Sequence, residues 1–233
     1  MPLVRTSRGT ASGTTSASLN FTPSANSRTF VFGTAVNHFS TTPGALSITG
    51  PGYTWNSAFT PHVDSGSAYR ARDGGWYADA GASPINVTVR VSSTNGQRIG
   101  IAIVEYTGLA FNALISDIVE GSSGSAAVNL GQPAAGNHML SFVQGYDASP
   151  NSFTPDGGAT AELFDDTLGA HAPFLTIAAQ VRESGTYTSL TWTSGYPRIW
   201  AWAIEIEVFE PDLIIPQFDL RRRLQTSKLI GAC

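Results

Sequence analysis

Apolar and polar residues alternate along several short stretches of the chain, the pattern of a strand with one buried and one solvent-facing side. The alternation is clearest over residues 85–91, where every second residue from Ile85 to Val91 is apolar. Asn95-Gly96, a dipeptide typical of tight hairpin turns, follows, and a second apolar run covers 99–106. These features predict a β-hairpin over 85–106.

A further alternating segment covers residues 198–208. Trp200, Trp202 and Ile204 fall on one face, whereas Glu205 and Glu207 fall on the other, so we expect a strand with one core side and one solvent side. Other segments broken by Pro and Gly also have strand character: 16–21, 29–36, 46–48, 68–72, 126–130, 139–144, 159–164, 175–181 and 189–192.

No segment has the i, i+3, i+4, i+7 spacing of an amphipathic helix, and only 109–119 has room for one short helical turn. The sequence therefore predicts an all-β protein, a two-sheet antiparallel β-sandwich of jelly-roll type.

One order of elements occurs twice along the chain. Residues 18–33 and 127–145 each read as a strand, a Pro-containing turn and a more apolar strand. Each half then ends in a hairpin, so the halves cover about 14–108 and 124–209. The halves either interleave into one sandwich or stand as two small units in tandem. The apolar connection over 109–115 favours one sandwich, because a flexible linker would be more polar.

The segment 211–233 differs from the rest of the chain. It is apolar at its start and carries a net charge of +2, whereas residues 1–210 carry −6. So many apolar side chains are costly to leave in water. We therefore expect an N-terminal arm (1–13), a β-sandwich domain (14–210) and a C-terminal extension (211–233) that docks on another subunit. The residues expected to bind that partner are Leu213, Ile214, Ile215, Phe218, Leu220, Arg221, Arg222 and Arg223.

Catalytic, cofactor-binding and metal-binding motifs are missing from the sequence. The four histidines lie far apart, no serine stands in a nucleophile elbow, and no glycine loop is suited to phosphate. The single cysteine, Cys233, excludes a disulfide within the chain. Glu105 interrupts an apolar strand, and we expect it on the outer face or near the strand end. The chain is expected to be non-enzymatic, with no cofactor and no metal.

Composition narrows the range of partners and locations. A net charge of −4 gives no electrostatic basis for binding nucleic acid. The chain lacks both a run of about 18 apolar residues for a membrane span and a signal peptide, so we expect synthesis in a cytoplasm. Charged residues make up only 13% of the chain, which suits a sheet-rich protein whose surface is partly covered by neighbours.

Aromatic residues gather in the first half of the chain. Carbohydrate-binding β-sandwiches stack sugar rings on exposed aromatic side chains and use carboxylates and amides for the hydroxyl groups. Residues 73–77 read as a turn that presents an aromatic side chain at its tip. Burial in the core is the competing interpretation. The residues considered for glycan binding are Trp55, Asp73, Trp76 and Tyr77.

Three pieces of the chain carry a resemblance to a known family: the strand pair over 19–33, Gly50-Pro-Gly-Tyr-Thr-Trp55, and Val104-Glu-Tyr-Thr-Gly108. They resemble the β-sandwich modules of minor tail and other virion proteins of tailed bacteriophages, in which a V-E-Y-S-G strand end is common. The resemblance covers about 14–209 and includes no catalytic signature. It implies a structural or adhesive virion subunit, often oligomeric.

The function expected from the sequence is that of a bacteriophage minor tail or tail-tip subunit. It would assemble as a homo-oligomer by docking on other virion proteins and would contact the host surface, with the virion as its location. Two alternatives stay open. One is a capsid decoration protein that clamps capsomer junctions, and the other is a carbohydrate-binding module that recognises a host cell-wall glycan.

Overall fold

A computed structural model of the chain describes residues 4–38, 41–64, 69–107, 114–122, 124–129, 137–147, 149–155, 161–168, 174–182, 189–196 and 198–206. These residues form antiparallel strands and no helix. The all-β, sandwich-like fold expected from the alternating pattern is therefore confirmed. No helix in the described ranges is long and apolar enough to cross a membrane.

The strands of the first half are β1 (Val4–Gly13), β2 (Ser16–Phe21), β3 (Ser27–His38), β4 (Ser47–Thr49), β5 (Asn56–Asp64), β6 (Tyr69–Asp79), β7 (Val87–Ser92) and β8 (Arg98–Thr107). The strands of the second half are β9 (Leu114–Ser122), β10 (Ser125–Asn129), β11 (His138–Asp147), β12 (Phe153–Pro155), β13 (Ala161–Leu168), β14 (Phe174–Arg182), β15 (Ser189–Ser194) and β16 (Arg198–Ile206). The predicted hairpin over 85–106 is wrong, because β7 pairs with β2 and β4 whereas β8 pairs with β1 and β3. The turn at Asn95, whose φ is 59°, therefore connects two layers rather than two paired strands. The hairpin expected at the end of the second half is wrong for the same reason, since β15 pairs with β10 and β12 and β16 pairs with β9 and β11.

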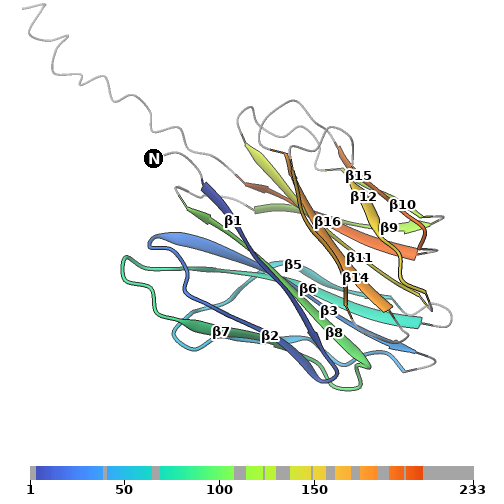
Figure 1. Cartoon of the computed structure of the whole chain (residues 1–233), viewed down its shortest axis with the longest axis horizontal. Coiled ribbons are helices and arrows are strands. Elements are labelled where there is room, and N and C mark those ends of the chain that lie inside the picture. The colour runs from blue at the N-terminus through green and yellow to red at the C-terminus, as the bar shows by residue number, and fades with distance from the viewer. Residues whose placement is uncertain are drawn as a thin grey trace, which may run out of the picture.

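The strands form a stack of layers, which Figure 1 shows from one side. In the first half, the sheet β2-β7-β4 covers one face of the sheet β1-β8-β3-β6-β5. The second half is one sheet of order β12-β15-β10-β9-β16-β11-β14-β13. Among the described residues, a single pair, Ser125 with Ser122, joins β10 to β9. The sheet folds back on itself between β9 and β10. As a result, Val128 of β10 and Trp192 of β15 belong to the same core as Ala201 of β16.

The second half repeats the strand order of the first. The order β9-β16-β11-β14-β13 corresponds to β1-β8-β3-β6-β5, and β12-β15-β10 corresponds to β4-β7-β2. The internal repeat expected from the sequence is therefore present in the topology. Its units begin earlier than expected, because 4–13, taken as an arm, is β1. Likewise 114–122, taken as part of a connection with a helical turn, is β9.

A shared irregularity aligns the two repeats residue by residue. The pairing of β5 with β6 shifts between Ser57 and Phe59, and the pairing of β13 with β14 shifts at the same place, between Glu162 and Phe164. Such β-bulges are characteristic features of a fold rather than defects. Following the strand registers from this bulge makes Phe32 equivalent to Phe142.

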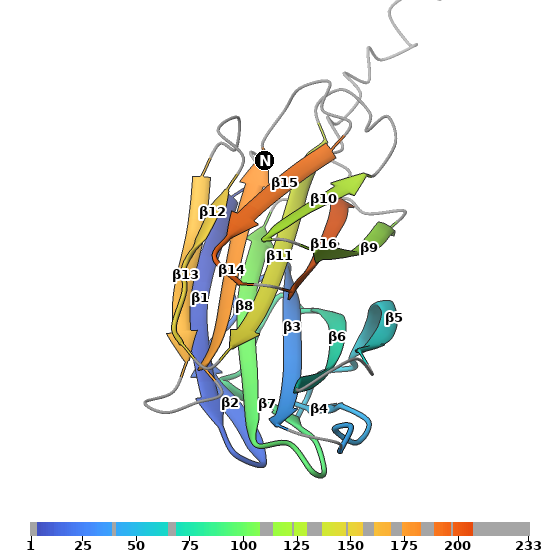
Figure 2. The same ribbon diagram turned by 90° about the vertical axis from the view of Figure 1, so that its right-hand side faces the viewer.

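Equivalent residues of the two repeats contact each other at their interface. Phe32 stacks on Phe142 with ring centroids 5.5 Å apart. Thr34 and Gln144 are also equivalent positions in the two repeats. They contact each other too, because the Thr34 hydroxyl donates a hydrogen bond of 3.2 Å to Gln144 Oε1. β1 lies against β13 and β5 against β9, as the view in Figure 2 also shows. These reciprocal contacts are those of an isologous dimer interface, formed here within one chain.

The largest hydrophobic core lies between the repeats, where both five-strand layers contribute aromatic side chains. Trp202 packs there on Phe32 and Phe59, with centroid distances of 4.8 and 5.7 Å. Each repeat has a second core beneath its three-strand layer. Within the described ranges no sheet mixes strands of the two repeats. The repeats thus do not interleave, contrary to the preferred expectation, but they do share one core.

Each repeat has part of the jelly-roll pattern. In the first, the pairs β1–β8, β2–β7 and β3–β6 nest inside one another. The described strand β5 pairs with β6 rather than with β4, so the innermost jelly-roll pair is not formed. The expectation for 198–208 is also half wrong, because both faces of β16 are covered and Glu205 is buried.

Candidate functional site

The four residues considered for glycan binding do not form one site. Residues 73–77 are not a turn but the middle of β6, which pairs along its length with β3 and β5. Alternate residues of a strand point to opposite faces. Trp76 therefore faces the first repeat's own small core, where Trp55 also packs. Asp73 and Tyr77 face the second repeat.

Asp73 is fully buried between the repeats, which removes it from any surface site. Gln144 Nε2 donates a hydrogen bond of 3.3 Å to Asp73 Oδ2 and Oε1 of the same amide accepts from Thr34. The Nδ1 atom of His62 lies 3.9 Å from Asp73 Oδ2. A polar chain inside an apolar core fixes the relative position of the elements that it joins. Asp73 thus helps to set the register between the repeats.

Tyr77 packs on the edge of the shared core, and its ring lies 4.8 Å from the guanidinium carbon of Arg28. Arg28 in turn donates two hydrogen bonds, of 2.5 and 2.6 Å, to Asp79. Tyr77 is thus held in a cation–π and ion-pair cluster of β3 and β6. This arrangement explains the residue structurally and places it on the opposite face of β6 from Trp76.

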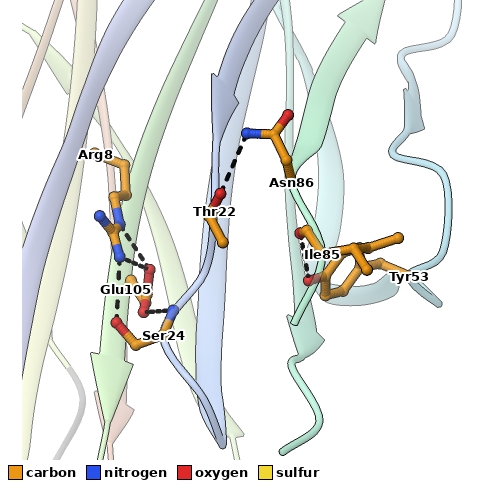
Figure 3. A network of polar contacts seen from close by, with 7 residues as sticks. All are labelled: Arg8, Thr22, Ser24, Tyr53, Ile85, Asn86 and Glu105. Atoms are coloured by element: carbon orange, nitrogen blue, oxygen red, sulfur yellow. Dashed lines mark hydrogen bonds and ion pairs between the residues drawn. The ribbon is translucent and has the colours of Figure 1, made fainter. Parts of the chain in front are cut away.

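Glu105 lies near the end of β8, as expected, but it is buried rather than on an outer face, with an exposure of 1%. Figure 3 shows Arg8 and Ser24 converging on it. Arg8 Nε donates a hydrogen bond of 2.6 Å to Oε2, and the backbone N–H of Ser24 donates one of 2.7 Å to Oε1. The carboxylate therefore links β1 and the β2–β3 turn to β8, and its role is structural.

The equivalent carboxylate of the second repeat is Glu205, since the registers place Glu105 opposite Thr29 and Glu205 opposite Met139. Glu205 is also buried, and it accepts a hydrogen bond of 2.6 Å from Asn137 Nδ2. Both repeats thus bury a carboxylate at the same place and hold it by hydrogen bonds, as buried charges require. Across the described ranges, no group of three or more His, Cys, Asp or Glu residues is placed to hold a metal ion.

An incompletely covered face of β5 and β6 remains as the candidate binding surface. Ser57 lies opposite Trp76, and Val63 lies opposite Arg72, and directly opposed residues share a face of the sheet. Trp55, two residues before Ser57, packs at the same small core as Trp76. We call these residues the β5–β6 ledge: Trp55, Ser57, Val63, Arg72, Gly74 and Trp76.

Sequence reasoning found two ledge residues, Trp55 and Trp76, and missed Arg72 and Ser57. Reading 73–77 as a strand would have placed Arg72 on the face of Trp76, because the two residues are an even number of positions apart. The residues expected to bind a partner through the C-terminal extension, Leu213 to Arg223, lie outside the described residues. No protein-family pattern matches the chain, and no curated protein matches it in sequence.

Proposed function

We propose that the chain is a non-enzymatic structural protein of a bacteriophage virion, a minor tail or tail-tip subunit that works by docking and display. The observation that carries the proposal is the arrangement of the two repeats. Their inner faces pack together in one shared core, which leaves the two outer three-strand layers among the faces available for contacts. The sequence resemblance to virion modules supports the same role.

Both outer layers present small polar side chains and little charge. On β2 and β7 the exposed positions include Asn20 and Thr88, whose side chains share a hydrogen bond of 2.7 Å, and the charged residue Arg90. On the second repeat they include Thr154 and Thr193. A free-standing soluble protein usually keeps many mixed charges on such faces. Faces with small polar side chains and little charge suit packing against neighbouring subunits in a particle.

The C-terminal extension supplies the proposed tether. The full chain should form a defined oligomer in solution, and a chain ending at Glu210 should be a folded monomer, because the apolar residues after Pro211 are then missing. Light scattering measures both masses, and circular dichroism checks that the shortened chain is folded. As a matched control, the full-length double variant Ile214→Asp and Phe218→Asp should also be monomeric. An unfolded, aggregating short chain would show that the extension belongs to the core.

A capsid decoration protein is the second proposal, since the same flat outer layers would suit contacts with a capsid lattice. Antibody labelling of particles separates the two roles. Label at the tail supports the tail-tip subunit, whereas label distributed over the head supports decoration.

A further inference from the structure

The β5–β6 ledge differs from the same place in the second repeat, which acts as an internal control. The bulge alignment makes Arg72, Gly74 and Trp76 of β6 equivalent to Thr176, Ala178 and Gln180 of β14. The three β14 residues have no exposed surface, whereas Arg72 and Trp76 are partly exposed. This face of the sheet is therefore sealed in the second repeat and open in the first.

The sealed version is closed by hydrogen bonds to the covering layer. The Thr176 hydroxyl donates to the backbone carbonyl of Asn151 at 2.9 Å, and Gln180 Nε2 donates to that of Thr191 at 3.3 Å. Phe153 and Tyr196 belong to the same buried core as Ala178. In the first repeat, the corresponding positions hold an indole and a guanidinium instead.

Two buried N–H donors at the ledge have no hydrogen-bond partner among the described residues. They are the indole Nε1 of Trp55 and the guanidinium Nε of Arg72. Buried donors are nearly always paired in folded proteins, because leaving one unpaired costs free energy. Both atoms are shielded from solvent, so a ligand oxygen pairs with either one only after neighbouring side chains shift.

The floor of the ledge is shaped by glycine. Gly74 lies opposite Gly33, and a Cβ atom on either residue would come within 2.9 Å of the Trp76 ring. The indole thus lies over these two glycines, on the side of Arg72. Trp76 and Arg72 are four residues apart along one strand, so their backbones are about 14 Å apart at roughly 3.4 Å per residue. The indole lies over Gly74, which halves the distance that a ligand must span to reach Arg72.

We propose that the β5–β6 ledge binds an acidic saccharide, with a pyranose ring against Trp76 and a carboxylate on Arg72. The apolar C–H face of a sugar ring packs well on an indole edge or face. A guanidinium binds a carboxylate through charge-assisted hydrogen bonds. Nucleic acids also bind to surfaces that carry aromatic and basic groups, but the net charge of −4 disfavours nucleic acid as the ligand.

This proposal deepens the host-contact part of the proposed function by naming its surface and ligand class. It does not depend on the role in the particle. A chain that fails to bind saccharide could still be a tail subunit, and a chain that binds saccharide could be missing from particles, so the two failures are distinguishable.

The test is calorimetric titration of the full chain with tetragalacturonate, an acidic oligosaccharide, and with maltotetraose, an uncharged one. The full chain should bind tetragalacturonate and bind maltotetraose at least about tenfold more weakly, because only the former pairs with Arg72. Arg72→Gln should lower the affinity for tetragalacturonate by about tenfold or more. Arg90→Gln is the matched control, since it removes an exposed arginine from the outer face of β7 and should leave the affinity unchanged.

Trp76→Leu should abolish binding, and thermal unfolding followed by circular dichroism shows whether this variant is folded. If it is unfolded, Arg72→Gln and its control carry the test alone. No binding of tetragalacturonate by the full chain would overturn the proposal. Equal losses of affinity for tetragalacturonate in Arg72→Gln and Arg90→Gln would overturn it too. The oligosaccharide would then be attracted by positive charge in general and not by Arg72 in particular. Equal affinity for both oligosaccharides would refute the acidic class.

Discussion

Replacing Trp202 by alanine should lower the free energy of unfolding by about 4 kcal/mol and should destabilise both repeats together. Trp202 has no exposed surface and belongs to the second repeat, yet two of its ring contacts, Phe32 and Phe59, belong to the first. The substitution leaves a cavity in the core that the repeats share. Small folded proteins are stable by only about 5–15 kcal/mol, so the loss is a large fraction of the total.

Chemical denaturation followed by tryptophan fluorescence and by circular dichroism measures this effect. The two signals should coincide in one transition, before and after the substitution. Trp202→Phe should lower the free energy of unfolding by less than Trp202→Ala. It keeps an aromatic ring and removes an indole N–H that has no partner among the described residues. Ile85→Ala, at a side chain with 57% exposure, should change stability by less than about 0.5 kcal/mol. Two separate transitions would contradict a shared core.

Replacing Arg8 by alanine should cost about 3 kcal/mol of stability, because it leaves the buried carboxylate of Glu105 without its ion-pair partner. Arg8 lies in β1, so the loss should also loosen this edge strand from β8. Thermal and urea unfolding measure the change in stability. Hydrogen exchange of the β1 amides measures the local loosening.

The matched control is the ion pair of Arg28 with Asp79, whose carboxylate side chain is 58% exposed. Asp79→Asn should cost less than about 1 kcal/mol, because solvent screens an exposed pair. A similar loss for Arg8→Ala and Asp79→Asn would mean that burial of Glu105 contributes nothing, and the explanation given for this residue would fail.

Strands with regular alternation could be predicted from the sequence, and strands without it could not. β7 and β8 were found because Val87, Val89 and Val91 alternate with polar residues and Asn95-Gly96 follows. β1 was missed because it carries no large apolar side chain in its central part and is placed by backbone pairing with β8. Gly9 in β1, with a φ of 100°, sits at a bulge of this pairing, a conformation that favours glycine.

The misreading of 73–77 has a clear physical cause. Two consecutive glycines usually indicate a turn. Here they allow close approach, since a Cβ on Gly75 would lie 1.9 Å from the Phe59 ring and one on Gly74 would meet Trp76. Glycine within a strand serves this purpose as readily as it serves a turn. The sequence alone does not distinguish the two uses.

Contacts between distant segments were beyond the reach of sequence patterns. Glu105 was taken as surface-facing because its partner, Arg8, is 97 residues away in the chain. The repeat was visible in the order of elements, but the pairing of its inner faces depends on side chains such as Phe32 and Phe142, whose contact no periodicity reveals. The open ledge likewise became visible only when the two repeats were aligned on their common bulge.

The role in the particle is tested most directly by measuring which proteins purified particles contain. Particles from a lysate in which this chain is made can be purified by density gradient, and the amount of the chain relative to the major capsid protein can be measured by quantitative mass spectrometry. A virion structural protein should co-sediment with particles at a fixed ratio that survives a second gradient. A chain that stays with soluble protein at the top of the gradient would contradict the virion role.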